Sequence, residues 1–128
     1  MGGRGDFIEK GGFKVTRFHK VDTVKVSTIG EIKIIRKNDL SAGLPMMSNT
    51  SSIYIGTDHK GNPNQIRFYK NREPVSEFNL KHGNMGAHFH DFADGKRLKT
   101  HRSPTAEEKA IVESIFQKLG ITIKWHTF

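Results

Sequence analysis

Histidines are concentrated in one stretch of the chain. Four of the seven lie within residues 82–101, and two of them, His88 and His90, are two positions apart. On a β-strand such residues project from the same face, whereas Phe89 between them projects from the other. A strand at residues 87–92 would therefore present two imidazoles side by side from a rigid element.

Two neighbouring imidazoles could cleave RNA without a metal. Imidazole has an unperturbed pKa of about 6.5, so it can act as a base or an acid near neutral pH. One neutral ring would take the proton of the 2′-hydroxyl, a second group would protonate the leaving oxygen, and a cation would stabilise the charged phosphorus centre. No cofactor is expected for this chemistry. The predicted site comprises His88 and His90 as the catalytic pair, with Lys96, Arg97, Lys99 and Arg102 as phosphate-binding cations.

A second nucleic-acid contact is predicted nearer the middle of the chain. There, cations alternate with an aromatic residue that could stack on a base. The residues are Arg67, Tyr69, Lys70 and Arg72. The alternative is a solvated strand face with Tyr69 packed at its edge, because successive strand residues alternate between the two faces.

The same histidines permit two other interpretations. Two His at i and i+2 on a strand can bind one metal ion, and Asp91 or His82 could add a ligand. Because the surrounding Lys and Arg residues repel cations, no metal is predicted; if this is wrong, the ligands would be His88, His90 and Asp91. The remaining interpretation is a solvated, histidine-rich strand without a role.

The composition favours a polyanionic partner. The 128 residues include 21 Lys and Arg against 13 Asp and Glu, which gives a net charge of +8 and a pI of about 9.9. Such a field attracts nucleic acid, and RNA is the expected partner; a host protein with an acidic surface is the alternative. The absence of cysteine excludes a disulfide scaffold, a thiolate zinc site and a cysteine nucleophile.

No membrane contact is expected. No apolar run approaches the roughly 18 residues that a membrane span requires, and the first residues lack the apolar core of a signal peptide. The expected compartment is therefore the cytoplasm. Nothing in the sequence specifies an oligomeric state.

The elements that would position these residues are mostly strands. Residues 1–12 are rich in glycine and are predicted to be a flexible lead, and residues 13–128 a single domain. Short connections dense in turn formers, at 58–64, 71–74 and 94–95, favour antiparallel hairpins. The predicted strands lie within residues 13–28, 32–35, 52–56, 65–69, 75–80, 87–92 and 121–125.

One helix is predicted, near residues 104–119. It could begin with Ser103 as the cap and Pro104 in the first turn, or with Thr105 as the cap and Glu108 completing a capping box. Its apolar stripe should pack on a sheet that includes residues 64–80. The stripe consists of Ile111, Ile115 and Leu119, flanked by Val112 and Phe116, and Gly120 would end the helix.

These elements predict an α+β fold, with a mostly antiparallel β-sheet meander, one main C-terminal α-helix and a final short strand.

The sequence also resembles small proteins encoded by phages and integrative elements of Gram-positive bacteria. The likeness covers roughly residues 50–120 and the opening Met-Gly-Gly-Arg-Gly. Segments 66–69, 75–80, 82–84, 87–90 and 95–97, and the Thr-x-x-Glu pattern at Thr105, carry it. Related domains occur fused to phage head-morphogenesis proteins and are grouped with the barnase–EndoU–colicin–RelE-like ribonucleases.

The resemblance implies a metal-independent, toxin-like endoribonuclease that acts in a bacterial host cell. His88, His90 and Arg97 match that family position by position, whereas Ala87 and Asn79 stand where it often has proline and aspartate. The alternative is a non-enzymatic phage or mobile-element module that binds nucleic acid or inhibits a host protein.

Overall fold

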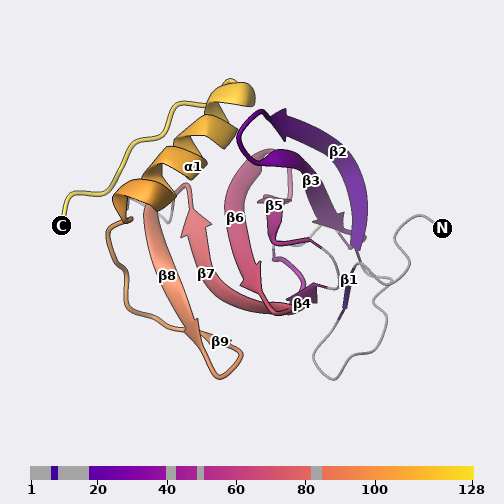
Figure 1. Ribbon diagram of the computed structural model, residues 1–128, viewed down its shortest axis with the longest axis horizontal. Coiled ribbons are helices and arrows are strands. Elements are labelled where there is room, and N and C mark those ends of the chain that lie inside the picture. The colour runs from indigo at the N-terminus through magenta and orange to yellow at the C-terminus, as the bar shows by residue number, and fades with distance from the viewer. Residues whose placement is uncertain (1–6, 9–17, 40–42, 49–50, 82–84) are drawn as a thin grey trace.

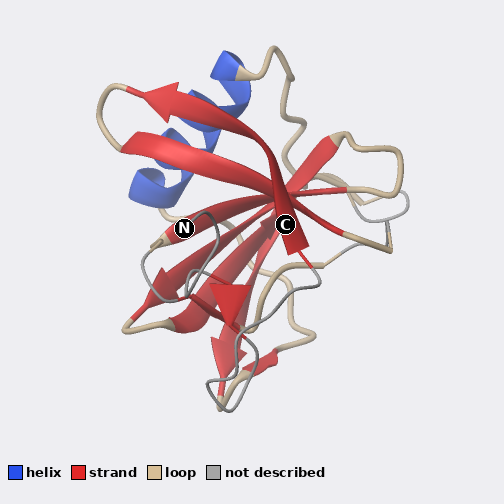
Figure 2. Cartoon of the chain, turned by 90° about the vertical axis from the view of Figure 1, so that its right-hand side faces the viewer, coloured by secondary structure: helices blue, strands red, loops and turns tan. Residues whose placement is uncertain are grey.

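The fold is built on a strongly curved sheet with one helix on one of its faces (Figures 1 and 2). The computed structural model describes residues 7–8, 18–39, 43–48, 51–81 and 85–128. The strands are β1 (Phe7–Ile8), β2 (Phe18–Val26), β3 (Gly30–Lys37), β4 (Met47–Ser48), β5 (Ile53–Thr57), β6 (Pro63–Lys70), β7 (Glu73–Asn79), β8 (His88–Ala93) and β9 (Lys96–Arg97), and the helix is α1 (Ala106–Lys118). The predicted α+β class, with a mostly antiparallel sheet and one C-terminal helix, is confirmed.

The main sheet has the strand order β2-β3-β5-β6-β7-β8-β9. Strands β5 to β9 form the antiparallel meander that the short turns predict, whereas β3 and β5 are parallel. A parallel pair needs a long connection, and here the loop between the two strands, residues 38–52, provides it. Part of that loop is strand, because β4 pairs with β1 in a separate two-stranded sheet.

Two tight turns fix the register of the meander. Asn71 and Arg72 both have positive φ angles, of 53° and 73°, as do Asp94 and Gly95, at 52° and 74°. Two consecutive residues with positive φ are typical of the type I′ turns that join twisted antiparallel strands. The second turn brings β9 back along β8 and carries the chain toward the histidines.

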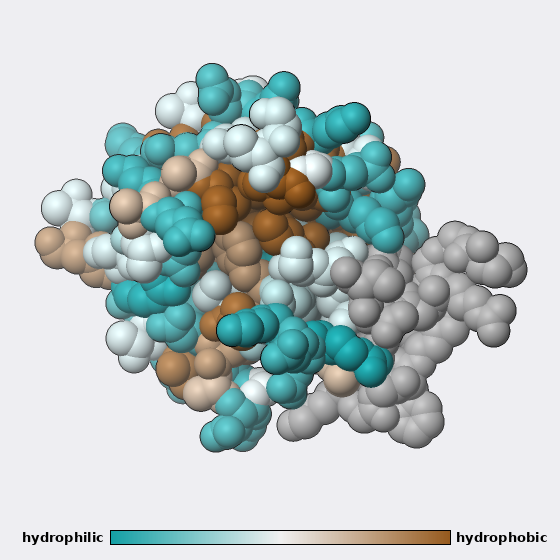
Figure 3. All heavy atoms as spheres, viewed as in Figure 1, coloured by the Kyte–Doolittle hydropathy of each residue, from teal (hydrophilic) through white to brown (hydrophobic). Residues whose placement is uncertain are grey.

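One face of the sheet packs against the helix. A row of directly paired residues crosses the four strands β5 to β8 on this face: Ile55, Ile66, Phe78 and Phe89. All four are fully buried, and the ring of Phe78 lies 5.5 Å from that of Phe116 on α1. The predicted packing of the helix on residues 64–80 is therefore confirmed. In the space-filling view, apolar residues gather near the centre beside α1, within a hydrophilic rim (Figure 3).

The helix begins with the second of its two predicted caps. The Thr105 hydroxyl accepts from the Glu108 backbone N–H, and the Glu108 carboxylate accepts from the Thr105 N–H. Val112, Ile115 and Phe116 are fully buried, while Ile111 and Leu119 pack at the margin of the core. The buried stripe is thus rotated from the predicted one.

The C-terminal segment forms fewer backbone pairings with the sheet than predicted. Instead of a strand over residues 121–125, Trp125 forms one parallel bridge with Ala87. The backbone passes so close to Gly86 that a Cβ there would lie 2.8 Å from the His126 nitrogen. The Trp125 indole packs 5.4 Å from Phe78 and donates to Glu113. Two backbone hydrogen bonds at Ala87 and the packing of Trp125 therefore hold this segment against the sheet.

The predicted N-terminal lead falls mostly outside the described residues. Of the predicted lead at residues 1–12, only β1 is described, and residues 13–17 are not. Within the described part of the chain, no helix has the length and apolar character that a bilayer crossing requires.

Arg102 ties the helix to the sheet, and this contact predicts a pH effect. Its guanidinium binds Glu108 at 2.7 and 2.8 Å and Asp91 at 2.9 Å, and it lies over the Phe89 ring. The hydrogen bond from Arg102 holds the pKa of Glu108 below its usual value. Because a depressed carboxyl pKa stabilises the fold above the unfolded pKa, this contribution should be lost as the pH falls below about 4.5.

Glu108→Gln should therefore lower the free energy of unfolding by about 1 kcal/mol at pH 7 and make it less sensitive to acid, since glutamine can still complete the capping box. Urea unfolding at pH 7 and pH 3.5 measures both effects. Glu107→Gln, at an exposed position of the same turn, is the matched control. Equal acid sensitivity in the wild type and Glu108→Gln would contradict the assignment.

Candidate functional site

The face of the sheet opposite α1 carries polar side chains. Because successive strand residues alternate, the neighbours of the apolar row on the helix side project from this other face. Two cross-strand rows run over it from β5 to β8. They are Tyr54, Arg67, Glu77 and His90, and Gly56, Gln65, Asn79 and His88. The two predicted catalytic histidines thus end two polar rows on β8.

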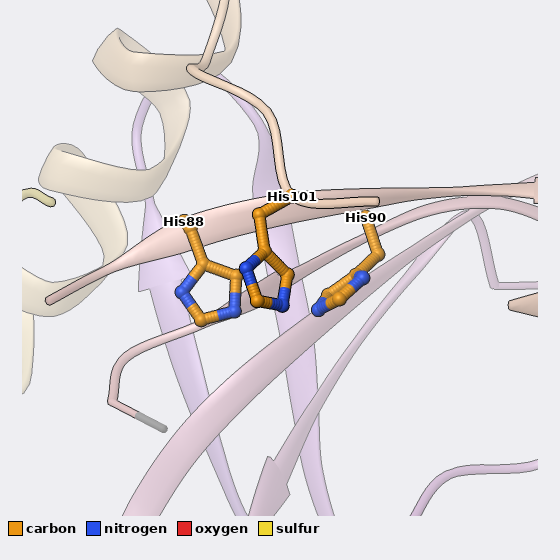
Figure 4. A group of neighbouring side chains, drawn as sticks. All are labelled: His88, His90 and His101. Carbon is orange, nitrogen blue, oxygen red and sulfur yellow. The ribbon is translucent and has the colours of Figure 1, made fainter. Parts of the chain in front are cut away.

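A third histidine joins this pair. Arg102 forms an antiparallel bridge with Phe89, with backbone hydrogen bonds of 3.0 and 2.9 Å, so His101 falls beside His90 on the polar face. The ring centroids of His88 and His90 are 5.0 Å apart, and His101 lies 4.4 Å from the first and 4.6 Å from the second. Figure 4 shows the three imidazoles projecting together, with His101 between the other two. We call these three residues the histidine cluster.

Backbone carbonyls fix the tautomers of the two strand histidines. The Nδ1 of His88 lies 2.8 Å from the Gly86 oxygen, and the Nδ1 of His90 lies 2.7 Å from the Leu98 oxygen. A carbonyl can only accept, so each Nδ1 carries the proton and each Nε2 carries the lone pair. The Nε2 of His90 is buried and has no hydrogen-bond partner among the described residues.

The environment favours the neutral form of His90. Burial is the largest cause that lowers the pKa of His90 below its usual value of 6.5; the positive charge of Arg97 and the neighbouring His101 act in the same direction. The hydrogen bond to Leu98 and the carboxylate of Glu77 oppose this shift. His88 and His90 are 0% and 2% exposed, whereas His101 is partly exposed, so His101 is the member of the cluster that solvent reaches.

A buried carboxylate orients an arginine beside the cluster. Glu77 pairs across the strands with His90, and its Oε1 accepts from Arg67 at 2.6 and 2.9 Å. Its Oε2 accepts from Arg97 at 2.9 Å and from Asn79 at 3.0 Å. The Glu77 side chain is 2% exposed, whereas that of Arg97 is 42% exposed. Arg97 is therefore a held but accessible cation.

The other predicted contact residues divide into interior and surface groups. The buried Arg67 also donates to the carbonyls of Leu44 and Pro45, and the Tyr69 hydroxyl donates to Pro45. Burial raises the pKa of Tyr69. These two side chains thus serve internal contacts, and Arg102 joins the helix to the sheet. Of the eight predicted cations and aromatics, five have exposed side chains: Lys70, Arg72, Lys96, Arg97 and Lys99. Arg97 pairs with Phe92 and so projects from the face of the histidine cluster, whereas Lys96 pairs with Ala93 and projects from the other face at the edge of the sheet.

Asp91, the predicted third ligand of the alternative metal site, lies apart from the cluster. It projects from the same face of β8 as Phe89, and Arg102 binds its carboxylate. His82 lies outside the described residues. The third member of the set that the structure assembles is His101.

Sequence reasoning missed three residues of this site: Glu77, Asn79 and His101. The sequence does contain an indication that Glu77 is buried. The apolar residues of segment 75–80 do not alternate regularly, because the pattern shifts by one residue after Val75. In the structure Val75 is 41% exposed, while Glu77 and Phe78 are both buried. A carboxylate at an inward position of a strand indicates a buried ion pair.

Comparisons of the chain with protein-family models, with curated proteins and with solved structures find no match.

Proposed function

We propose that this protein is a metal-independent endoribonuclease in which His88 and His90 form the acid–base pair. One observation carries the proposal: the two imidazoles are held in the tautomer that directs the Nε2 lone pair away from the backbone, on one sheet face beside Arg97. Fixed orientation is what proton transfer to and from a substrate requires. In a bacterial cytoplasm such an activity would be toxin-like.

The reaction uses the 2′-hydroxyl of RNA as the nucleophile. The neutral His90 takes the 2′-hydroxyl proton at Nε2, and the 2′-oxygen forms a bond to phosphorus. The bond from phosphorus to the 5′-oxygen breaks, and His88 gives that leaving oxygen a proton, which its Nε2 must first take up from solvent in place of the lone pair. Arg97 stabilises the additional negative charge on the phosphoryl oxygens. The products are a 2′,3′-cyclic phosphate and a free 5′-hydroxyl.

Access to the pair depends on His101. Its ring lies against both buried imidazoles, and it is the member of the cluster that is partly exposed. Rotation of the His101 side chain would admit a phosphate to the ring nitrogens beneath. The exposed Lys96 and Lys99 would attract the RNA backbone to this edge of the sheet.

The decisive test is cleavage of a single-stranded RNA by purified protein in EDTA. We expect fragments that end in 2′,3′-cyclic phosphate, and no cleavage of DNA of the same sequence, because DNA lacks the attacking hydroxyl. RNA that stays intact after long incubation would overturn the nuclease proposal. Cleavage that EDTA abolishes would replace it with metal-dependent chemistry.

A binding module is the second candidate, and the burial of His88 and His90 favours it. This candidate uses the same basic rim without a chemical step, either on nucleic acid or on an acidic surface of a host protein. It predicts no cleavage of any RNA, and effects on a host cell that survive replacement of both histidines.

Salt dependence distinguishes these partners. Each phosphate contact releases counterions and contributes roughly 0.7 to the slope of log K against log salt for a single strand. Lys96→Ala combined with Arg97→Ala should therefore reduce the slope by about 1.4 and weaken binding to all RNA sequences alike. Fluorescence anisotropy between 50 and 200 mM salt, as a working range, measures this.

Lys118→Ala, at the far end of α1, removes one surface charge away from the rim and is the control; it should leave the slope unchanged. Binding that does not respond to salt would point to a protein partner. An unchanged slope in the double variant would place the RNA on another surface.

A further inference from the structure

We infer that the histidine cluster is a binding site for a transition-metal ion of the zinc type. His88, His90 and His101 each offer one ring nitrogen, and these three atoms lie within 4.8 Å of one another. They come from β8 and from the segment that bridges to its edge, so the backbone of the sheet positions them. Three imidazoles from a rigid element are a ligand set used for zinc.

The hydrogen bonds behind the rings support metal binding. Histidine ligands commonly donate their second ring N–H to a carbonyl or carboxylate, which fixes the tautomer and makes the coordinating nitrogen more basic. The carbonyls of Gly86 and Leu98 do this for His88 and His90. The buried Nε2 of His90 has no partner among the described residues, and a metal ion would satisfy it.

The distances require only a small adjustment. Tetrahedral zinc with Zn–N bonds of about 2.0–2.1 Å separates its ligand nitrogens by about 3.4 Å. Ring rotations that shorten the nitrogen–nitrogen separations by up to about 1.4 Å would bring the cluster from its present limit of 4.8 Å into that range. Three protein ligands would leave the fourth position of a tetrahedral ion open.

The charges around the cluster set its selectivity. Imidazole nitrogen favours zinc, nickel and copper, whereas magnesium and calcium prefer carboxylate and carbonyl oxygen. The nearest carboxylate, Glu77, is already neutralised by Arg67 and Arg97, and Asp91 lies on the other face. The site should therefore bind zinc in preference to magnesium.

A bound ion would also block the proposed nuclease. Coordination would occupy the lone pair that His90 needs as a base, and would prevent His88 from carrying a proton. Zinc is thus expected to inhibit cleavage, and EDTA to restore it. This consequence rests on the proposed function, whereas the binding of the metal does not.

Titration of the intact chain with Zn²⁺ and Co²⁺ tests the site without RNA. Calorimetry should give one ion per chain, and bound Co²⁺ should show the visible absorption of a tetrahedral ion. His90→Ala and His101→Ala should each weaken binding by more than about 100-fold, beyond the 10–100-fold that loss of an outer-shell partner costs. His59→Ala, in the turn between β5 and β6, is the control and should bind as the wild type does.

His101 is partly exposed, so its replacement keeps the test independent of any folding defect in His90→Ala. Zinc should raise the melting temperature of the wild type and leave that of His101→Ala unchanged. Absence of binding, or equal binding by His101→Ala and the wild type, would overturn the site. Metal binding without any RNA cleavage would uphold the site and refute the nuclease; cleavage that zinc-loaded protein still performs would refute the inhibition.

Discussion

Replacement of His90 should slow RNA cleavage by about 10²–10⁴-fold, the range for a positioned proton-transfer group. The same range is expected for His88→Ala. The preferred variant is His90→Asn, because its amide N–H can still donate toward the Leu98 carbonyl while it has no titratable nitrogen. Single-turnover cleavage in EDTA measures the rate.

RNA affinity should change little in the same variant, because the phosphates are held by the exposed cations and not by the buried ring. Fluorescence anisotropy provides this second measurement, and His59→Asn serves as the control outside the cluster. A loss of cleavage in proportion to a loss of binding would mean that His90 acts only in binding or folding. A rate within about tenfold of the wild type would remove His90 from the proposed chemistry.

The comparison of His101 with the strand pair shows how far sequence reasoning could reach. His88 and His90 share a face because strand residues two apart always do, so their juxtaposition follows from the spacing alone. The position of His101 depends on pairing register. Phe92 pairs with Arg97, yet Phe89 pairs with Arg102, so the returning chain gains two residues relative to β8. No local pattern predicts such a displacement.

The same distinction holds for the fold. Alternation and turn chemistry located β6, β7, β8 and the turn at residues 94–95, because each depends on neighbours in sequence. The parallel pairing of β3 with β5, and the single bridge of Trp125 to Ala87, depend on contacts between distant segments. The sequence allowed two starts for the helix, and the capping box at Thr105 was one of them. The Glu108 carboxylate favours this start because it accepts hydrogen bonds from both the Thr105 N–H and the Arg102 side chain.

The polar rows explain why forming the candidate site costs free energy of folding. An imidazole, a carboxylate and a guanidinium follow one another across β8, β7 and β6, each nearly excluded from water. Such groups are stable in the interior only when every charge is paired and hydrogen-bonded. Glu77 satisfies this condition for Arg67 and at the same time orients Arg97 toward solvent. Stability of the sheet and orientation of the proposed phosphate-binding cation thus depend on one carboxylate.

Glu77→Ala should consequently lower the free energy of unfolding by about 3–5 kcal/mol, because it leaves the buried Arg67 without its counter-charge. Such a loss is a large part of the 5–15 kcal/mol by which domains are typically stable. Urea denaturation of the wild type and the variant measures it. Replacing both partners, as Arg67→Met with Glu77→Leu, should cost much less than Glu77→Ala alone, since no unpaired charge remains.

Arg97→Ala separates the two roles of this network. Its side chain is 42% exposed, so its ion pair with Glu77 should contribute no more than about 1 kcal/mol to stability. RNA cleavage should nevertheless fall, because Arg97 is the cation that the network directs toward the phosphate. A Glu77→Ala variant nearly as stable as the wild type would show that Arg67 does not depend on Glu77 for its charge balance. An Arg97→Ala variant that cleaves RNA at the wild-type rate would show that the carboxylate stabilises the sheet alone.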